Sequence, residues 1–141
     1  MFRYYGYFCN MKTILKSYPL TLLVIAAILF LSLFNPPKTK LDPITYIDKI
    51  AHICMYGGLG LVIWFEYLRS HIKINIRKIV IWAVIAPIVL GGLMEIAQMC
   101  LTTERSGEWA DFAADSIGVM LATVAGFTLL KRWVHCKKQE R

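Results

Sequence analysis

Four stretches of the chain are almost continuously apolar and contain no Asp, Glu, Lys or Arg. They are Ser17–Pro37, Ile50–Phe65, Ile79–Met94 and Ser116–Leu130. A helix on the surface of a soluble protein shows a polar face that recurs every 3.6 residues. The middle sections of these stretches lack such a face. The pattern therefore indicates helices that are surrounded by apolar material on all sides.

The lengths of these stretches match a lipid bilayer. A hydrocarbon core about 30 Å thick needs roughly 20 helical residues. The first stretch meets that length directly, and the other three meet it once their polar ends are included. The expected helices are Asp48–Leu68, Ile79–Leu101 and Asp111–Leu130. We predict an all-α integral membrane bundle of four transmembrane helices over residues 17–131, with an N-terminal segment at 1–16 and a basic tail at 132–141.

Lysine and arginine positions predict the orientation of this bundle. Of the 16 Lys and Arg residues, three precede the first apolar stretch, four lie in 69–78 and five in 131–141. Residues 102–110 contain only Arg105, and 35–49 contain three. Cytoplasmic loops carry the excess of positive charge, so both termini and the 69–78 loop are expected in the cytoplasm. The net charge of +7 is then explained by contact with anionic lipid headgroups, and no nucleic-acid motif is present.

The first apolar stretch is predicted to remain in the protein. It is too long for a signal peptide and no small-residue cleavage site follows it. Ser17 is expected to cap this helix, with Pro19 in its first turn. Either Met1 or Met11 is compatible with this arrangement as the start of the chain.

Prolines and small residues predict how the helices bend and pack. Pro87 lies inside the third expected helix, where it removes a backbone hydrogen bond and meets the carbonyl of Ala83, so a kink is predicted. Gly91 and Gly92 follow within a turn and allow close backbone approach. The fourth helix has a small residue at every fourth position, at Ala114, Gly118, Ala122 and Gly126. Such a stripe is typical of tight helix packing in membranes.

Charged residues gather at the predicted outer ends of the helices. Asp48 and His52 share a helix face because they are four residues apart, and Lys49 lies about a quarter-turn away. Asp111 and Asp115 share a face of the fourth helix in the same way. An ionisable residue within the membrane indicates a functional site. For Asp48 and Asp111 a second explanation stays open, since an aspartate in a first helical turn caps the helix and complements its dipole.

Glu95 is the acidic residue that helix structure explains least. It lies in the C-terminal half of its helix, where the helix dipole disfavours a negative charge, and Gln98 shares its face. A buried carboxylate there has to be protonated, paired with Lys49, His52 or Arg105, or engaged by a ligand. Arg105 also offers a planar fork that suits phosphate or carboxylate.

The order of these polar residues along the chain resembles the VanZ-like family. The resemblance rests on Pro36-Pro37-Lys38, Asp48-Lys49, His52, Glu95, Gln98, Arg105-Ser106-Gly107, Asp111 and Gly118. It covers roughly residues 32–126. Asp115 stands where the family often has asparagine, which bears on any role that needs a neutral amide. The family takes its name from a protein associated with low-level resistance to teicoplanin, a lipid-bearing glycopeptide. The resemblance implies a protein of the bacterial cytoplasmic membrane with a role in the cell envelope.

Two functions are compatible with the sequence. The first is a membrane protein that binds or modulates an envelope amphiphile, a lipid headgroup or a lipoglycopeptide-like molecule. Its candidate binding residues are Asp48, Lys49, His52, Glu95, Gln98, Arg105, Asp111 and Asp115. The alternative is an intramembrane enzyme acting on a lipid-linked substrate, with His52 or Glu95 as general acid or base. In it, His52 and the nearby carboxylates hold a divalent cation. No cofactor is identified, and neither HExxH nor GxSxG is present.

Overall fold

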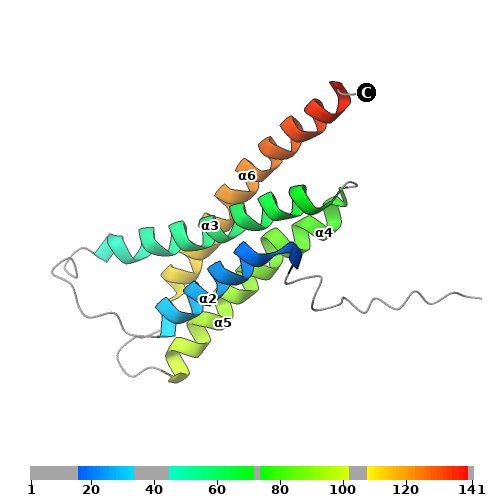
Figure 1. Ribbon diagram of the computed structural model, residues 1–141. Helices are drawn as coiled ribbons and strands as arrows, with labels where there is room; N and C mark the ends of the chain where they lie inside the picture. Colours follow the sequence, from blue (N-terminus) through cyan, green and yellow to red (C-terminus); the bar gives the residue numbers. More distant parts are fainter. Residues whose placement is uncertain (1–15, 34–44, 72–73, 102–107, 140–141) are drawn as a thin grey trace, which may run out of the picture.

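The computed structural model describes residues 16–33, 45–71, 74–101 and 108–139, and they form a bundle of helices (Figure 1). The helices in chain order are α2 (Pro19–Leu33), α3 (Thr45–Ser70), α4 (Ile76–Val80), the π-helical turn η1 (Ile81–Ile85), α5 (Ala86–Leu101) and α6 (Trp109–Gln139). The α4, η1 and α5 segments follow one another without a break and form one continuous helical rod. The all-α fold is thus as predicted.

Three of these rods are long and apolar enough to cross a membrane: Ile47–Ser70, Ile76–Leu101 and Trp109–Leu129. The described part of α2 has 15 residues, which gives about 22 Å at 1.5 Å per residue. That is less than the roughly 30 Å of a hydrocarbon core. The structure therefore supports a membrane protein with three candidate spans. A fourth span stays a prediction, and residues 34–37, which end the first apolar stretch, lie outside the described residues.

The bundle is built around a close crossing of α3 and α6. A Cβ atom added to Gly118 would collide with the backbone of α3 at Ile53 and would come within 2.9 Å of Gly57 N. One turn further along, a Cβ added to Gly60 would lie 2.7 Å from Ala122 Cβ. The small-residue stripe of α6 faces α3, so its predicted packing role is confirmed.

The start of α2 is held by a residue from another helix. The Glu66 carboxylate on α3 accepts hydrogen bonds from Leu20 N (2.8 Å), Thr21 N (3.0 Å) and Thr21 Oγ1 (2.6 Å). The first backbone N–H groups of a helix have no partner within the helix, and an anion at this position also complements the helix dipole. The prediction that Ser17 caps this helix is wrong, because Glu66 occupies that role.

The sequence predicts a kink at Pro87, and the structure has a π-helical turn directly before the segment that contains this proline. η1 ends directly before the α5 segment that contains Pro87, and Ala86 N–H donates to Ile81 O, five residues earlier. Proline removes one helical donor, and single π-helical turns are a known form of local irregularity inside α-helices. The α4–η1–α5 rod therefore stays continuous through the membrane region.

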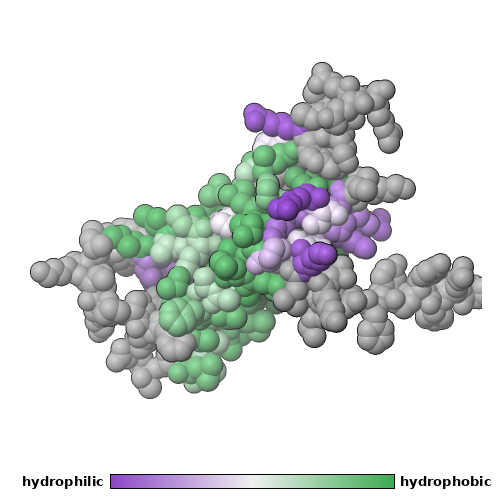
Figure 2. Space-filling model, viewed as in Figure 1, coloured by the Kyte–Doolittle hydropathy of each residue, from purple (hydrophilic) through white to green (hydrophobic). Residues whose placement is uncertain are grey.

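The outer surface of the described residues is mainly apolar. On the face that Figure 2 shows, the bundle is mainly hydrophobic, and hydrophilic residues are concentrated where α3 ends and α4 begins. Large apolar side chains such as Leu23, Phe65 and Val124 are more than half exposed, as expected for side chains that face lipid. Inside, the core includes Tyr56, Leu59 and Trp64. The α6 helix continues to Gln139, well beyond the Leu130 limit predicted from hydropathy.

Candidate functional site

The polar side chains meet at the end of the bundle where α3 and α6 begin and α5 ends. Asp48 and His52 come from the first turns of α3, Glu95 from the last turns of α5, and Asp111 and Asp115 from the first turns of α6. We call these five residues the carboxylate–histidine cluster. The predicted site residues on three separate helices are thereby brought together. Apart from Asp48, all members of the cluster are buried.

His52 and Asp115 form a buried pair across the α3–α6 interface. His52 Nδ1 and Asp115 Oδ1 are 2.8 Å apart, and the side chains are 6% and 1% exposed. The pair fits here because Gly91 on α5 leaves room beside the Asp115 carboxylate: a Cβ at position 91 would lie 2.8 Å from Asp115 Oδ2. This contact orients the imidazole ring toward the carboxylate.

Lys49 lies next to the cluster, in the first turns of α3. Its ammonium group donates to Asp111 Oδ1 (3.2 Å) and to Glu108 Oε2 (3.3 Å). Asp111 lies in the first turn of α6, as predicted, but its carboxylate is bound by a lysine of α3. This pairing links the starts of α3 and α6. It also engages the only lysine that the sequence placed near the site.

Glu95 accepts a hydrogen bond from a backbone N–H group. Among the described residues it forms no ion pair with a basic side chain. Its Oε2 accepts a hydrogen bond from Glu108 N–H (2.9 Å), and its Oε1 is buried without a hydrogen-bond partner. The sequence leaves pairing with Lys49 or His52 open as one alternative for Glu95, and the described part of the chain forms neither ion pair. Lys49 is bound by the carboxylates of Asp111 and Glu108, and His52 is bound by Asp115. Arg105 lies outside the described residues.

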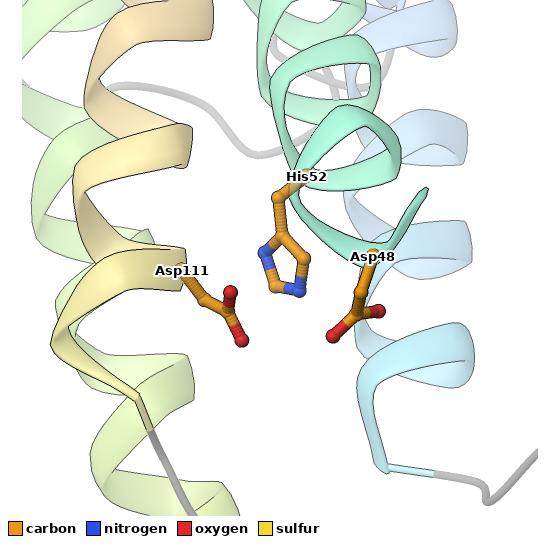
Figure 3. A group of neighbouring side chains, drawn as sticks. All are labelled: Asp48, His52 and Asp111. Carbon is orange, nitrogen blue, oxygen red and sulfur yellow. The ribbon is translucent and has the colours of Figure 1, made fainter. Parts of the chain in front are cut away.

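Two overlapping groups of donor atoms in the cluster can hold a metal ion. In one group, ligand atoms of Asp48, His52 and Asp111 all lie within 4.8 Å of one another; in the other, those of His52, Glu95 and Asp115 do. Figure 3 shows the imidazole of His52 between the carboxylates of Asp48 and Asp111, with one side chain coming from α6 and the other from the same helix as the histidine. His52 is the member that both groups share.

Gln98 has a structural position beside the cluster. It is buried and lies about one helical turn after Glu95 on α5. Its side-chain amide donates a hydrogen bond to the carbonyl of Ser32 at the end of α2 (3.1 Å). This contact ties α2 to α5. Gln98 was predicted as a binding residue, and the structure places it among the helix contacts next to the cluster.

Sequence reasoning missed two residues of the site. Glu108, directly before α6, joins Lys49 and Glu95 through its carboxylate and its backbone N–H. Tyr56 buries a hydroxyl without a hydrogen-bond partner among the described residues. The spacing of His52 and Tyr56, four residues apart on one helix face, was a usable signal for Tyr56. Glu108 has no such signal, since it lies in a polar stretch.

A groove runs along the outside of α5 and the start of α6, next to the cluster. Its volume is about 230 Å³. Apolar side chains form most of its wall: Val89, Leu93, Ile96, Met99, Trp109 and Phe112. Glu95 and Glu108 are also among its lining residues. The groove therefore connects a lipid-facing apolar surface with the carboxylates of the site.

Comparison of the chain with protein-family models, with curated proteins and with solved structures gave no match in any of the three. The function is therefore inferred from the geometry of the site.

Proposed function

We propose that the protein binds a membrane amphiphile, with the apolar tail in the α5–α6 groove and the polar head at the carboxylate–histidine cluster. The proposal rests on one observation: a residue of the carboxylate–histidine cluster is also a lining residue of the groove. Glu95 belongs to the cluster and also lines the groove. A molecule with an apolar part and a polar part can satisfy both surfaces at once, in the way that ligand sites combine apolar walls with a few convergent polar groups.

The charges of the described residues favour a cationic or amine-bearing head. The cluster and its neighbour Glu108 contain five carboxylates, and Lys49 and His52 are the bases among the described residues that face them. Lys49 and His52 are already engaged by carboxylates. An ammonium group adds the positive charge and the donors that the buried Glu95 Oε1 lacks. This balance favours an amine over the phosphate or carboxylate that the sequence suggests for Arg105.

The orientation of the site is part of this proposal. Positive charge among the described residues concentrates at the opposite end of the bundle, where Arg69, Arg77 and Lys78 are exposed. With four spans and cytoplasmic termini, the positive-inside rule puts that end in the cytoplasm and the cluster at the outer face of the bacterial cytoplasmic membrane. An outward-facing site for an envelope amphiphile also agrees with the VanZ-like resemblance.

A groove-filling variant tests the proposal. Purified protein is incubated with lysophosphatidylethanolamine or with its N-acetylated form, and bound amphiphile is counted by native mass spectrometry. We expect preferential retention of the free amine and its loss in Gly92→Leu, because Gly92 lines the groove and a Cβ there already contacts Phe112 at 3.4 Å. Gly58→Leu is the matched control, since a Cβ at Gly58 meets nothing within 4 Å. Equal retention of both amphiphiles by all three proteins contradicts the proposal.

One observation supports a second candidate, an intramembrane enzyme. The Asp115 carboxylate orients the His52 imidazole at 2.8 Å, which is how a carboxylate positions a histidine that acts as a general base. Such an enzyme changes the mass of a lipid-linked substrate. Mass spectrometry of membrane lipids from cells with wild-type protein and with His52→Gln tests this candidate, and identical lipid profiles exclude it.

A further inference from the structure

We propose that His52, Glu95 and Asp115 bind one divalent transition-metal cation of the Zn²⁺ or Mn²⁺ class. This inference goes beyond the proposed function: the ion binds the same Glu95 carboxylate that would hold the ammonium head, so the metal and the head compete for this residue. Metal binding itself needs no amphiphile, so the two proposals can fail separately.

The first support is the set of buried polar atoms without hydrogen-bond partners. Among the described residues these include Glu95 Oε1, Asp115 Oδ2 and the hydroxyl of Tyr56. Glu95 is 7% exposed, and Asp115 is fully buried. An unsatisfied buried polar group costs about 1–3 kcal/mol, and more when it is charged. Buried polar atoms that lack partners call for a specific explanation such as an ion, and a cation accounts for both carboxylate oxygens together.

The second support is geometric. One ligand atom from each of His52, Glu95 and Asp115 lies within 4.8 Å of the other two, and His52 Nδ1 is 2.8 Å from Asp115 Oδ1. Two ligands that share an ion with bonds of about 2.1 Å lie roughly 3–4 Å apart, depending on the angle between them. Small side-chain rotations therefore bring all three residues to one ion. Neutral imidazole and two carboxylates also balance the charge of a dication, which suits a buried position.

The surrounding residues complete the site in the manner of known metal centres. When His52 Nδ1 binds the ion, Nε2 carries the proton and faces the other two carboxylates, between which Figure 3 places the ring. A ligating histidine commonly donates its second ring N–H to a carboxylate, and the carboxylates of Asp48 and Asp111 lie on either side of the ring. The other carboxylate oxygen of Glu95, Oε2, accepts a hydrogen bond from Glu108 N–H.

The ligand types indicate the class of metal. Imidazole suits Zn²⁺ and other late first-row ions, whereas carboxylates also suit Mn²⁺. Ca²⁺ and Mg²⁺ prefer oxygen ligands alone, so the histidine makes them less suitable. A shared proton between Glu95 and Asp115 is the competing explanation, and it predicts no metal binding at all.

Binding of the metal alone tests the inference. Full-length protein in detergent is stripped with chelator and titrated with Zn²⁺ by calorimetry, and Mn²⁺-loaded wild-type protein is examined by pulsed EPR. We expect one ion per chain, a higher unfolding temperature with metal, and hyperfine coupling to one imidazole nitrogen. Because changes to a metal site cost at least about tenfold in affinity, Glu95→Gln and Asp115→Asn should each weaken binding by that factor or more.

The controls use a histidine and a carboxylate outside the cluster. His71 stacks on Tyr67, and Glu66 caps α2, so His71→Gln and Glu66→Gln should bind metal as the wild type does. The EPR measurement is made on the wild-type protein, so it tests metal binding by histidine even if Asp115→Asn does not fold. Absence of stoichiometric binding or of the nitrogen coupling overturns the inference. Metal binding that persists in Gly92→Leu while amphiphile binding is lost separates the inference from the proposed function.

Discussion

Gly91 on α5 makes room for the carboxylate of Asp115 on α6. A Cβ atom at position 91 would lie 2.8 Å from Asp115 Oδ2 and 3.3 Å from Asp115 Cβ. The carboxylate cannot retreat from such an atom, because His52 holds its other oxygen at 2.8 Å. The glycine that the sequence marked as a point of close approach is thus part of the architecture of the site.

Gly91→Ala should therefore perturb the cluster. Alanine is favoured over glycine within a helix by about 1 kcal/mol, but the added methyl group pushes the Asp115 carboxylate off His52. We expect Zn²⁺ affinity to fall by about tenfold or more, as for other changes around metal ligands, while the unfolding temperature changes little. Gly58→Ala is the control, since its Cβ enters open space. Unchanged affinity in Gly91→Ala contradicts the placement of Asp115 in the metal site.

Glu66→Ala should loosen α2. It leaves two backbone N–H groups and the Thr21 hydroxyl without the carboxylate that accepts their hydrogen bonds. A fully buried donor left unpaired costs about 1–3 kcal/mol, and these three donors are partly buried. We expect a clear drop in the thermal unfolding temperature in detergent and faster proteolysis before α3. Glu108→Ala removes an exposed ion pair with Lys49, which is worth about 0–1 kcal/mol, and it should lower the temperature much less.

Gly118→Leu should lower the abundance of the protein in the membrane. Its side chain meets the backbone of α3 at Ile53 and Gly57, and backbone cannot move aside without separating the two helices. Overpacking of this kind costs typically about 1–3 kcal/mol. Immunoblots of membrane fractions measure the effect against Gly58→Leu. Equal abundance of the two variants would show that α3 and α6 do not pack through Gly118.

The convergence of the cluster could be predicted from the sequence for a simple reason. Each polar residue stands at the end of an apolar stretch, and consecutive helices that cross a layer alternate in direction. His52 and Asp115 begin their helices and Glu95 ends its helix, so all three fall at one end of the bundle. The small-residue stripe of α6 could also be recognised from the sequence, because residues four apart lie on one face of a helix.

The contacts inside the cluster could not be predicted in the same way. Glu66 caps a helix 45 residues away in sequence, and its partners are backbone groups that carry no sequence signal. Glu108 binds Lys49 and Glu95 only because α3, α5 and the start of α6 meet in three dimensions. Hydropathy also ends α6 at Leu130, whereas the backbone continues as a helix to Gln139, since basic residues are good helix formers outside the membrane.

The proposed orientation predicts a labelling pattern. Single-cysteine variants at His71 and at Glu108 are treated with a membrane-impermeant maleimide on intact cells. We expect labelling at 108 and protection at 71, because Arg69, Arg77 and Lys78 mark the cytoplasmic end. Permeabilised cells control for reactivity and should label at both positions. Labelling at 71 and protection at 108 in intact cells would turn the site toward the cytoplasm.

Glu95→Gln separates a working site from a structural contact. Glutamine keeps the shape of the side chain, and its carbonyl oxygen can still accept the hydrogen bond from Glu108 N–H. Removing one partner of a buried ion pair destabilises a protein by about 3–5 kcal/mol, but the described residues hold no base that binds Glu95 directly. We therefore expect normal abundance in membranes together with loss of amphiphile retention and of an envelope phenotype such as altered susceptibility to a lipoglycopeptide. Gly92→Leu should give the same phenotype through the groove. Normal abundance with full activity would remove Glu95 from the site, and low abundance would make it a structural tether.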